Sequence, residues 1–237
     1  MKRYYILDQF RGFTIISMVL FHMFYDINIF IDIPWYTNPI FNHIWQLSIA
    51  MSFFLISGIT SNFLSGKKNI ERGIKISILG VAITLVTYIF DRSLLIVFGV
   101  LNGLGISMII VGLLEGRVDF KAYQGLIFFI LFILTYRIPK GEFLGRQLYL
   151  SIYDYNIFPL GFPSSSFYST DYFPIIPWIF IYLSGYIWGK KLIEKDFYNI
   201  KGRNDILAKI GQHSLGIYLV HQVVIYLLVY GFFTYIN

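Results

Sequence analysis

The sequence contains no cysteine, and only 14% of its 237 residues are charged. The absence of cysteine excludes disulfides, thiol catalysis, cysteine-bound zinc and iron–sulfur clusters. Soluble domains usually carry about 25% charged residues, so the low charged fraction argues against a soluble domain. Hydrophobic residues make up 57% of the chain. This composition predicts an integral membrane protein, in which a net charge of +6 reflects cytoplasmic loops and gives no support for a nucleic-acid partner.

Seven stretches are apolar and long enough to be membrane-spanning helices, which need about 20 mainly apolar residues. They are residues 10–31, 43–64, 72–90, 94–114, 122–138, 173–190 and 212–235. If the N-terminus is cytoplasmic, 15 of the 19 Lys and Arg residues, among them Lys2, Arg3, Lys195 and Lys201, lie on the cytoplasmic side. Cytoplasmic loops are enriched in these residues. We therefore expect an all-α polytopic transmembrane bundle of about seven spans, N-terminus in and C-terminus out, forming one domain over 1–237.

The longest outer loop covers residues 139–171 and is rich in aromatic residues, Gly, Pro and Ser. Loops of this length without structure of their own are more often functional than idle. We expect it to fold back over the outer face of the bundle or to dip partly into it.

The first span, "LDQFRGFTIISMVLFHMFYD" (residues 7–26), carries four ionisable residues on one stripe. At 100° per residue, Asp8, Arg11, His22 and Asp26 fall within an arc of roughly 60°. A charged group at the bilayer centre costs roughly 2.5–3.5 kcal/mol, so this stripe must face the bundle interior or a water-filled cavity. Asp8 and Arg11 are spaced to pair at the inner edge, and His22 and Asp26 to pair in the outer half.

The stripe has a structural and a functional interpretation. Buried ion pairs could simply hold helices together. Alternatively, a carboxylate hydrogen-bonded to an imidazole fixes its tautomer and raises its basicity, which suits His22 to act as a general base with Asp26 orienting it.

The last span shows a second polar stripe in "GQHSLGIYLVHQ", where Ser214, Tyr218, His221 and Gln222 share a face. Hydrogen bonds between helices, worth about 0.6 kcal/mol on average, would explain this stripe without any chemistry. A binding role is the alternative.

Two further motifs carry polar groups. In "STDYFPIIPW", Asp171 stands at the outer entrance of the sixth span, where Ser169 or Thr170 could cap that helix and its dipole would favour the acid. In "FGVLNGLG", Asn102 lies inside the fourth span among glycines. The spacing of the four histidines gives no sign of a metal cluster, and no metal is expected.

These motifs, together with "FFLISG", resemble in their order the heparan-α-glucosaminide N-acetyltransferase-like catalytic domain family, including small bacterial members of the transmembrane acyltransferase superfamily. The resemblance implies an all-helical membrane fold. It also implies transfer of an acyl group, usually acetyl from acetyl-CoA on the cytoplasmic side, to a sugar on the other side.

The resemblance also suggests residue roles. The lysosomal enzyme's catalytic His lies in the first outer loop, where this chain has Thr37–Asn38 and the nearest histidine is His43. Related acyltransferases instead carry a His in the first helix, where His22 stands. Acyl transfer would then use His22, Asp26 and Asp171. A second set would hold the acyl-CoA or its reacting carbonyl: Arg11, Asn102, Tyr218 and His221.

Three functions stay open at this point. The first is a membrane acyltransferase of a bacterial plasma membrane that modifies an extracytoplasmic glycan or small molecule. The second is a small-molecule transporter or flippase, because polar stripes also mark transport paths, although no inverted repeat is visible. The third is an accessory membrane subunit. The acceptor and a homo-oligomeric state cannot be derived from the sequence.

Overall fold

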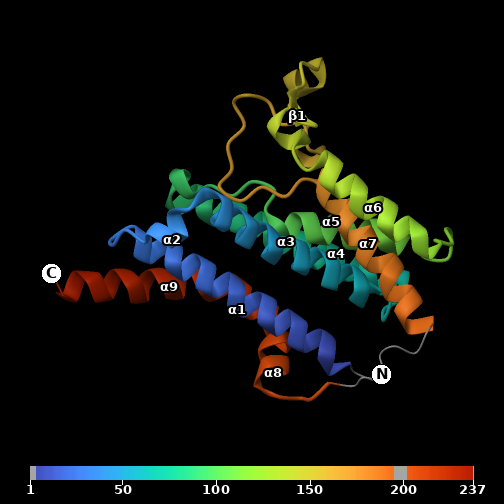
Figure 1. The fold of residues 1–237 in the computed structure, drawn as a ribbon, viewed down its shortest axis with the longest axis horizontal. Helices are drawn as coiled ribbons and strands as arrows, with labels where there is room; N and C mark the ends of the chain where they lie inside the picture. Colours follow the sequence, from blue (N-terminus) through green and yellow to red (C-terminus); the bar gives the residue numbers. More distant parts are fainter. Residues whose placement is uncertain (1–3, 195–201, 237) are drawn as a thin grey trace. The chain divides into compact units, whose positions relative to one another are not determined.

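The computed structural model describes residues 4–194 and 202–236, and most of them are helical (Figure 1). Four of the basic residues expected on the cytoplasmic side lie outside this range, namely Lys2, Arg3, Lys195 and Lys201. The helices are α1 (Tyr5–Asn28), α2 (Pro34–Thr37), α3 (Pro39–Ser61), α4 (Gly66–Phe90), α5 (Val100–Leu114), α6 (Ala122–Thr135), α7 (Ile175–Glu194), α8 (Ile206–Gln212) and α9 (Ser214–Ile236). Two short antiparallel strands, β1 (Glu142–Phe143) and β2 (Arg146–Gln147), interrupt them. The predicted all-α membrane fold is confirmed.

Each of the seven expected spans contains a helix, but not all of them have the length of a span. By length and apolarity, five segments could cross a membrane: α1, α3, α4, α9 and residues 122–140, which begin with α6. Helix α5 is apolar but has only 15 residues. Helix α7 is interrupted at Ile176, whose φ of −94° and ψ of 123° are not helical. A residue that precedes proline is disfavoured in the helical region, and Pro177 follows Ile176.

The described residues divide into two compact units, with the division inside α3 between Ile56 and Ser57. The first unit contains α1, α2, the longer part of α3, α8 and α9. Its core gathers Ile15, Met18, Phe21, Tyr36 and Ile49. Helix α1 packs on α8 and α9. Contacts of α9 with α1 advance together along both helices, from His22 with His221 to Phe30 with Phe233, so these two helices run in the same direction.

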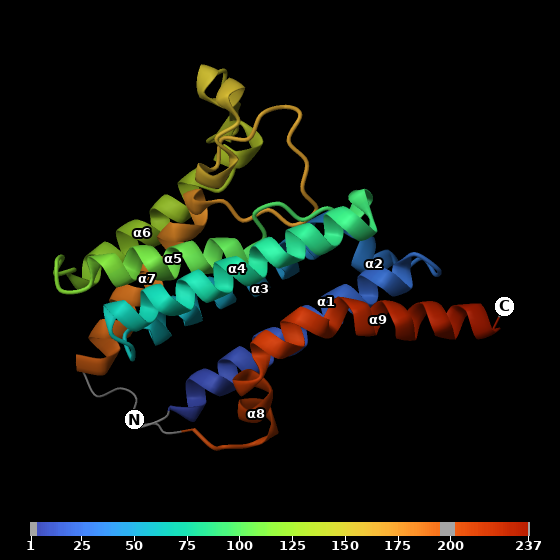
Figure 2. The same cartoon turned by 180° about the vertical axis from the view of Figure 1, so that it is seen from behind.

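The second unit contains the rest of α3 and α4 to α7, in which α4 packs on α5 and α7 packs on both α5 and α6 (Figure 2). Helices α4 and α5 are antiparallel and touch backbone to backbone at glycines spaced seven residues apart. A Cβ on Gly73 would lie 2.5 Å from the Gly105 carbonyl oxygen, and one on Gly66 would lie 2.5 Å from that of Gly112. Small residues allow such close approach, which is typical of membrane helix pairs.

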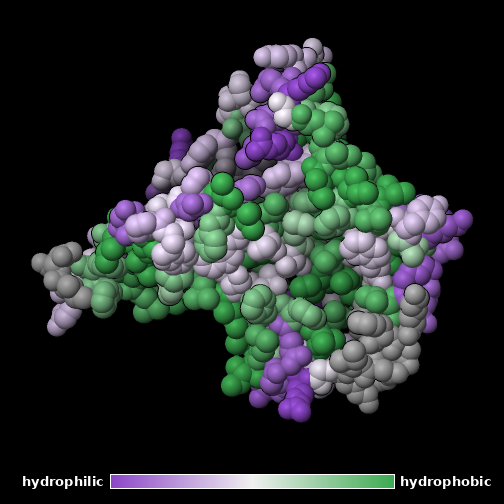
Figure 3. Space-filling view, in the orientation of Figure 1, coloured by the Kyte–Doolittle hydropathy of each residue, from purple (hydrophilic) through white to green (hydrophobic). Residues whose placement is uncertain are grey.

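The outward faces of the long helices are apolar, as lipid contact requires. Large exposed hydrophobic side chains occur along α4, α6 and α9, with Phe90 85% and Leu228 68% exposed. In Figure 3 hydrophobic atoms cover α6, whereas hydrophilic atoms gather over the segment of β1 and β2.

The outer loop carries short local structure, which the sequence did not predict. Besides β1 and β2 it contains three 3₁₀ turns, at Ile138–Lys140, Ser151–Tyr155 and Phe158–Leu160. Its end joins the segment before α5: the Thr170 N–H donates to the Leu95 carbonyl at 2.9 Å. Side chains of the loop line a hollow of 770 Å³ that includes Lys140, Tyr149, Asp154, Ser165 and Tyr168.

Candidate functional site

The polar stripes of the first and last long helices meet in the first unit. The rings of His22 on α1 and His221 on α9 lie 4.9 Å apart between centroids, at an interplanar angle of 61°. One turn along α1, the Asp26 carboxylate accepts hydrogen bonds from Gln222 Nε2, at 3.2 Å to Oδ1 and 3.3 Å to Oδ2. Positions 22 and 26 share a helix face, so consecutive residues of α9 reach both of them.

The expected pair of His22 and Asp26 is not formed. In the part of the chain that the structure describes, no hydrogen bond joins these two side chains, and Gln222 occupies the carboxylate instead. Asp26 is only 3% exposed, and a buried carboxylate requires hydrogen-bond donors. The amide of Gln222 meets that requirement across the helix pair.

His221 is held by its own helix. Its Nδ1 lies 2.6 Å from the carbonyl oxygen of Tyr218, one turn earlier. Its Nε2 is buried and has no hydrogen-bond partner among the described residues. Nδ1 of this imidazole is therefore fixed by the backbone, while Nε2 is shielded from water and makes no hydrogen bond with the described residues.

Aromatic rings form a wall beside His22. Phe21 meets the His22 ring edge to face at 5.7 Å and the Trp45 ring at 5.4 Å. Trp45 is oriented by its Nε1, which donates to Ser17 Oγ at 2.8 Å. Nothing in the sequence pattern linked Trp45 to His22, because Trp45 lies on α3, whereas His22 lies on α1, and Trp45 is not ionisable.

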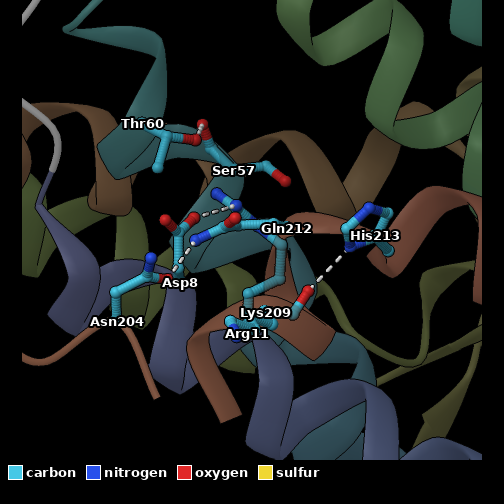
Figure 4. A network of polar contacts seen from close by, with 8 residues as sticks. All are labelled: Asp8, Arg11, Ser57, Thr60, Asn204, Lys209, Gln212 and His213. Atoms are coloured by element: carbon cyan, nitrogen blue, oxygen red, sulfur yellow. Dashed lines mark hydrogen bonds and ion pairs between the residues drawn. The ribbon is translucent and has the colours of Figure 1, made fainter. Parts of the chain in front are cut away.

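The N-terminal end of α1 carries the predicted ion pair, in which Arg11 Nη1 and Asp8 Oδ1 are 3.1 Å apart (Figure 4). Helix α8 packs beside it and is capped by Asp205, which accepts a hydrogen bond from the Ala208 N–H at 2.9 Å. That backbone bond holds the pKa of Asp205 below its ordinary value. Gln212 donates to Asn204 at 3.2 Å. The Arg11 side chain is 23% exposed.

Ser169 and Thr170 do not cap the sixth expected span, so that expectation is wrong, and Asp171 lies at the start of α5 instead. In the second unit its Oδ2 accepts a hydrogen bond from the N–H of Val100, the first residue of α5, at 3.3 Å. Ser169 likewise serves the segment before α5, because its Oγ accepts from the Val97 N–H at 2.8 Å. The physical reason is that Ile176 interrupts the start of α7, whereas α5 presents free N–H groups close by.

Burial raises the pKa of the Asp171 carboxyl from 3.8 to about 6, although the Val100 N–H acts in the opposite direction. The adjoining backbone is strained at Phe98, whose φ of 58° is rare for a bulky residue. The Phe98 carbonyl accepts from the Phe173 N–H at 2.9 Å. Asp171 thus lies where the end of the outer loop, the segment before α5 and the first residue of α5 are hydrogen-bonded together.

Asn102 lies on α5 and faces α4. Its Nδ2 donates to the Ser77 carbonyl at 3.3 Å, and its buried Oδ1 has no partner within the described ranges. One amide N–H is therefore used in helix packing. Across residues 4–194 and 202–236, no group of three His, Asp or Glu side chains is placed to hold a metal ion.

Apolar helices with ionisable and amide side chains on their inward faces define a polytopic integral membrane protein. The sequence matches the family model described as "Heparan-alpha-glucosaminide N-acetyltransferase, catalytic" over residues 3–223, and the chain belongs to this family. The predicted family is thereby confirmed, and with it a function of the membrane acetyltransferase type. No curated protein matches the sequence. No solved structure matches it.

Proposed function

We propose that this protein transfers an acyl group, most simply acetyl, from cytoplasmic acetyl-CoA to a hydroxyl or amine of an extracytoplasmic glycan or small molecule. The observation that carries the proposal is the meeting of His22 with His221 and of Asp26 with Gln222 between two apolar helices of a chain in this family. Ionisable groups are costly in a membrane and are functional by default.

The proposal includes seven spans with the N-terminus in the cytoplasm of a bacterium. The parallel course of α1 and α9 supports it, because the first and last spans of an odd-numbered bundle cross in the same direction. The distribution of basic residues supports the same orientation.

The donor is assigned to the first unit. Arg11 at the inner end of α1 holds phosphate groups of acetyl-CoA, since guanidinium groups bind phosphates well. From Arg11 to His22 the helix rises about 15–20 Å, a distance that an extended pantetheine arm covers. His22 takes the proton of the acceptor as its oxygen or nitrogen attacks the acyl carbonyl, and then returns that proton to the departing CoA thiolate. Tyr218 is assigned to the oxyanion that forms on the carbonyl.

A surface that captures the acceptor is assigned to the outer loop. The hollow of the outer loop combines exposed tyrosines with hydroxyl, amine and carboxylate groups, a mixture suited to a polar acceptor such as a sugar. Asp171 is assigned to binding the acceptor at the end of this loop.

The test is acetyl-CoA turnover by the purified protein in lipid, with His22→Asn compared against His43→Asn. Free thiol release is expected to require an acceptor and to be retained by His43→Asn. In His22→Asn it should fall at least about 100-fold, as expected for loss of a general base. A folded His22→Asn protein with full activity would remove the base from the proposal. Wild-type protein that fails to bind acetyl-CoA would overturn acyl transfer and favour the transporter.

A further inference from the structure

The Nε2 atom of His221, which is buried without a hydrogen-bond partner among the described residues, indicates a role that neither the polar stripe nor the family assigns. A carbonyl oxygen can only accept a hydrogen bond, so the 2.6 Å contact with the Tyr218 carbonyl places the proton of neutral His221 on Nδ1. Nε2 then carries a lone pair. It is buried without a partner among the residues that the structure describes, and a buried acceptor of this kind is costly unless a donor reaches it.

The nearest ring that can supply a donor is His22. The two rings lie 4.9 Å apart between centroids and are tilted by 61°, so a rotation of one ring would direct its N–H at the lone pair of the other, a bond that the described contacts do not yet contain. Asp26 is not the partner of His22, because Gln222 occupies its carboxylate. Among the described residues no carboxylate is bonded to His22 to fix its tautomer, and His221 is placed to provide that function.

We infer that His221 is a positioning residue for His22: its Nδ1–H is held by the Tyr218 carbonyl, and its Nε2 accepts the N–H of His22. The other nitrogen of His22 then presents its lone pair to the acceptor. When His22 takes the acceptor's proton, the imidazolium donates more strongly to Nε2, which stabilises it. No proton is transferred to His221, and the proton on His22 leaves with the CoA thiol. This catalytic consequence rests on the proposed function, whereas the imidazole pair does not.

The pair is tested first, without any turnover. The full chain, labelled with 15N-histidine and reconstituted in lipid, is studied by solid-state NMR at neutral pH. Only four histidines are present, so His22→Asn, His43→Asn and His213→Asn assign all signals. His221 is expected to carry its proton on Nδ1 and to show a nitrogen–nitrogen cross-peak with His22. A proton on Nε2, or a missing cross-peak, would overturn the inference.

The second measurement compares His221→Leu with His221→Gln, whose side-chain carbonyl can still accept a hydrogen bond. His221→Leu is expected to lower kcat on the order of 10- to 100-fold with little change in KM, as for lost partners of a functional histidine. His221→Gln should recover part of this loss. Equal activity of both variants and wild type would overturn the role.

His213 supplies the matched control, because its Nδ1 makes the same kind of contact, 2.9 Å from the Lys209 carbonyl, but on an exposed ring. His213→Leu is expected to retain wild-type kcat. If the wild-type protein turns over no acetyl-CoA at all, the proposed function fails, while the NMR experiment still decides the imidazole pair.

Discussion

The contact between Asp26 and Gln222 shows how individual polar residues are accommodated in an apolar helix pair. The carboxylate is almost fully buried and depends on one amide for both of its hydrogen bonds. Gln222→Leu is expected to destabilise the protein by about 1–3 kcal/mol, because it leaves the carboxylate without this donor. Thermal unfolding in detergent measures the effect.

A double-mutant cycle provides the control for this contact. Asp26→Leu with Gln222→Leu should destabilise less than the sum of the single changes, since coupling is expected between residues in contact. Additive effects would mean that the two side chains do not interact.

Asp171 should make stability depend on pH. Its carboxyl has a folded-state pKa of about 6, raised by burial from 3.8. A raised acid pKa means that the folded state holds its proton more tightly, so this group lowers stability as pH rises from about 4 through 6. Asp171→Asn keeps an oxygen for the Val100 N–H and should therefore unfold at a higher temperature than wild type at pH 7.5.

The same comparison at pH 4 contains the control. There Asp171 is protonated in the folded protein, so the two melting temperatures should converge. A constant difference between the proteins at both pH values would show that Asp171 titrates normally.

At the residue scale, the sequence predicted what could be derived from one helix at a time. The Asp8–Arg11 ion pair was predicted correctly because the two residues lie three positions apart on α1. The partner of Asp26 was missed because Gln222 lies 196 positions away, and no local spacing contains that information. The helix that Ser169 and Asp171 serve was also assigned wrongly, because their partners Val97 and Val100 lie 72 and 71 positions away.

At the scale of elements, the antiparallel pair of α4 and α5 depends on glycine. A Cβ on Gly73 would lie 2.5 Å from the Gly105 carbonyl oxygen, whereas nothing lies within 4 Å of a Cβ on Gly231 in α9. Gly73→Ala should therefore destabilise by about 1–3 kcal/mol through overpacking. Gly231→Ala should be neutral or stabilising by up to about 1 kcal/mol.

Unfolding of both alanine variants under one condition checks this prediction. Equal effects would show that the close approach of the two backbones does not limit stability.

Helix positions were largely predictable, because apolar runs of sufficient length have few alternatives in a membrane. The residues at which helices begin and end were less predictable. The start of α7 depends on Pro177, which disfavours helical geometry at Ile176, and the strands of the outer loop depend on a tight turn without a strong sequence signal. The seven-span topology stays a prediction, since α5 is short.

At the scale of the whole molecule, topology can be measured with single cysteines, because the chain contains none. With a cytoplasmic N-terminus and seven spans, Leu94→Cys and Ser165→Cys should react with a membrane-impermeant maleimide in intact cells. Ser65→Cys and Val118→Cys should react only after lysis. Labelling of Val118→Cys in intact cells would mean that α5 does not cross.

The junction around Asp171 ties the end of the outer loop to the start of α5 through four backbone amides. The N–H groups of Val97, Val100, Thr170 and Phe173 all donate across it. Neighbouring backbone bonds often open as one cooperative unit, so these four amides are expected to exchange with deuterium at similar rates. Whatever loosens the loop end therefore also frays the first turn of α5, and a molecule that immobilises the loop would slow exchange in a helix that it never touches.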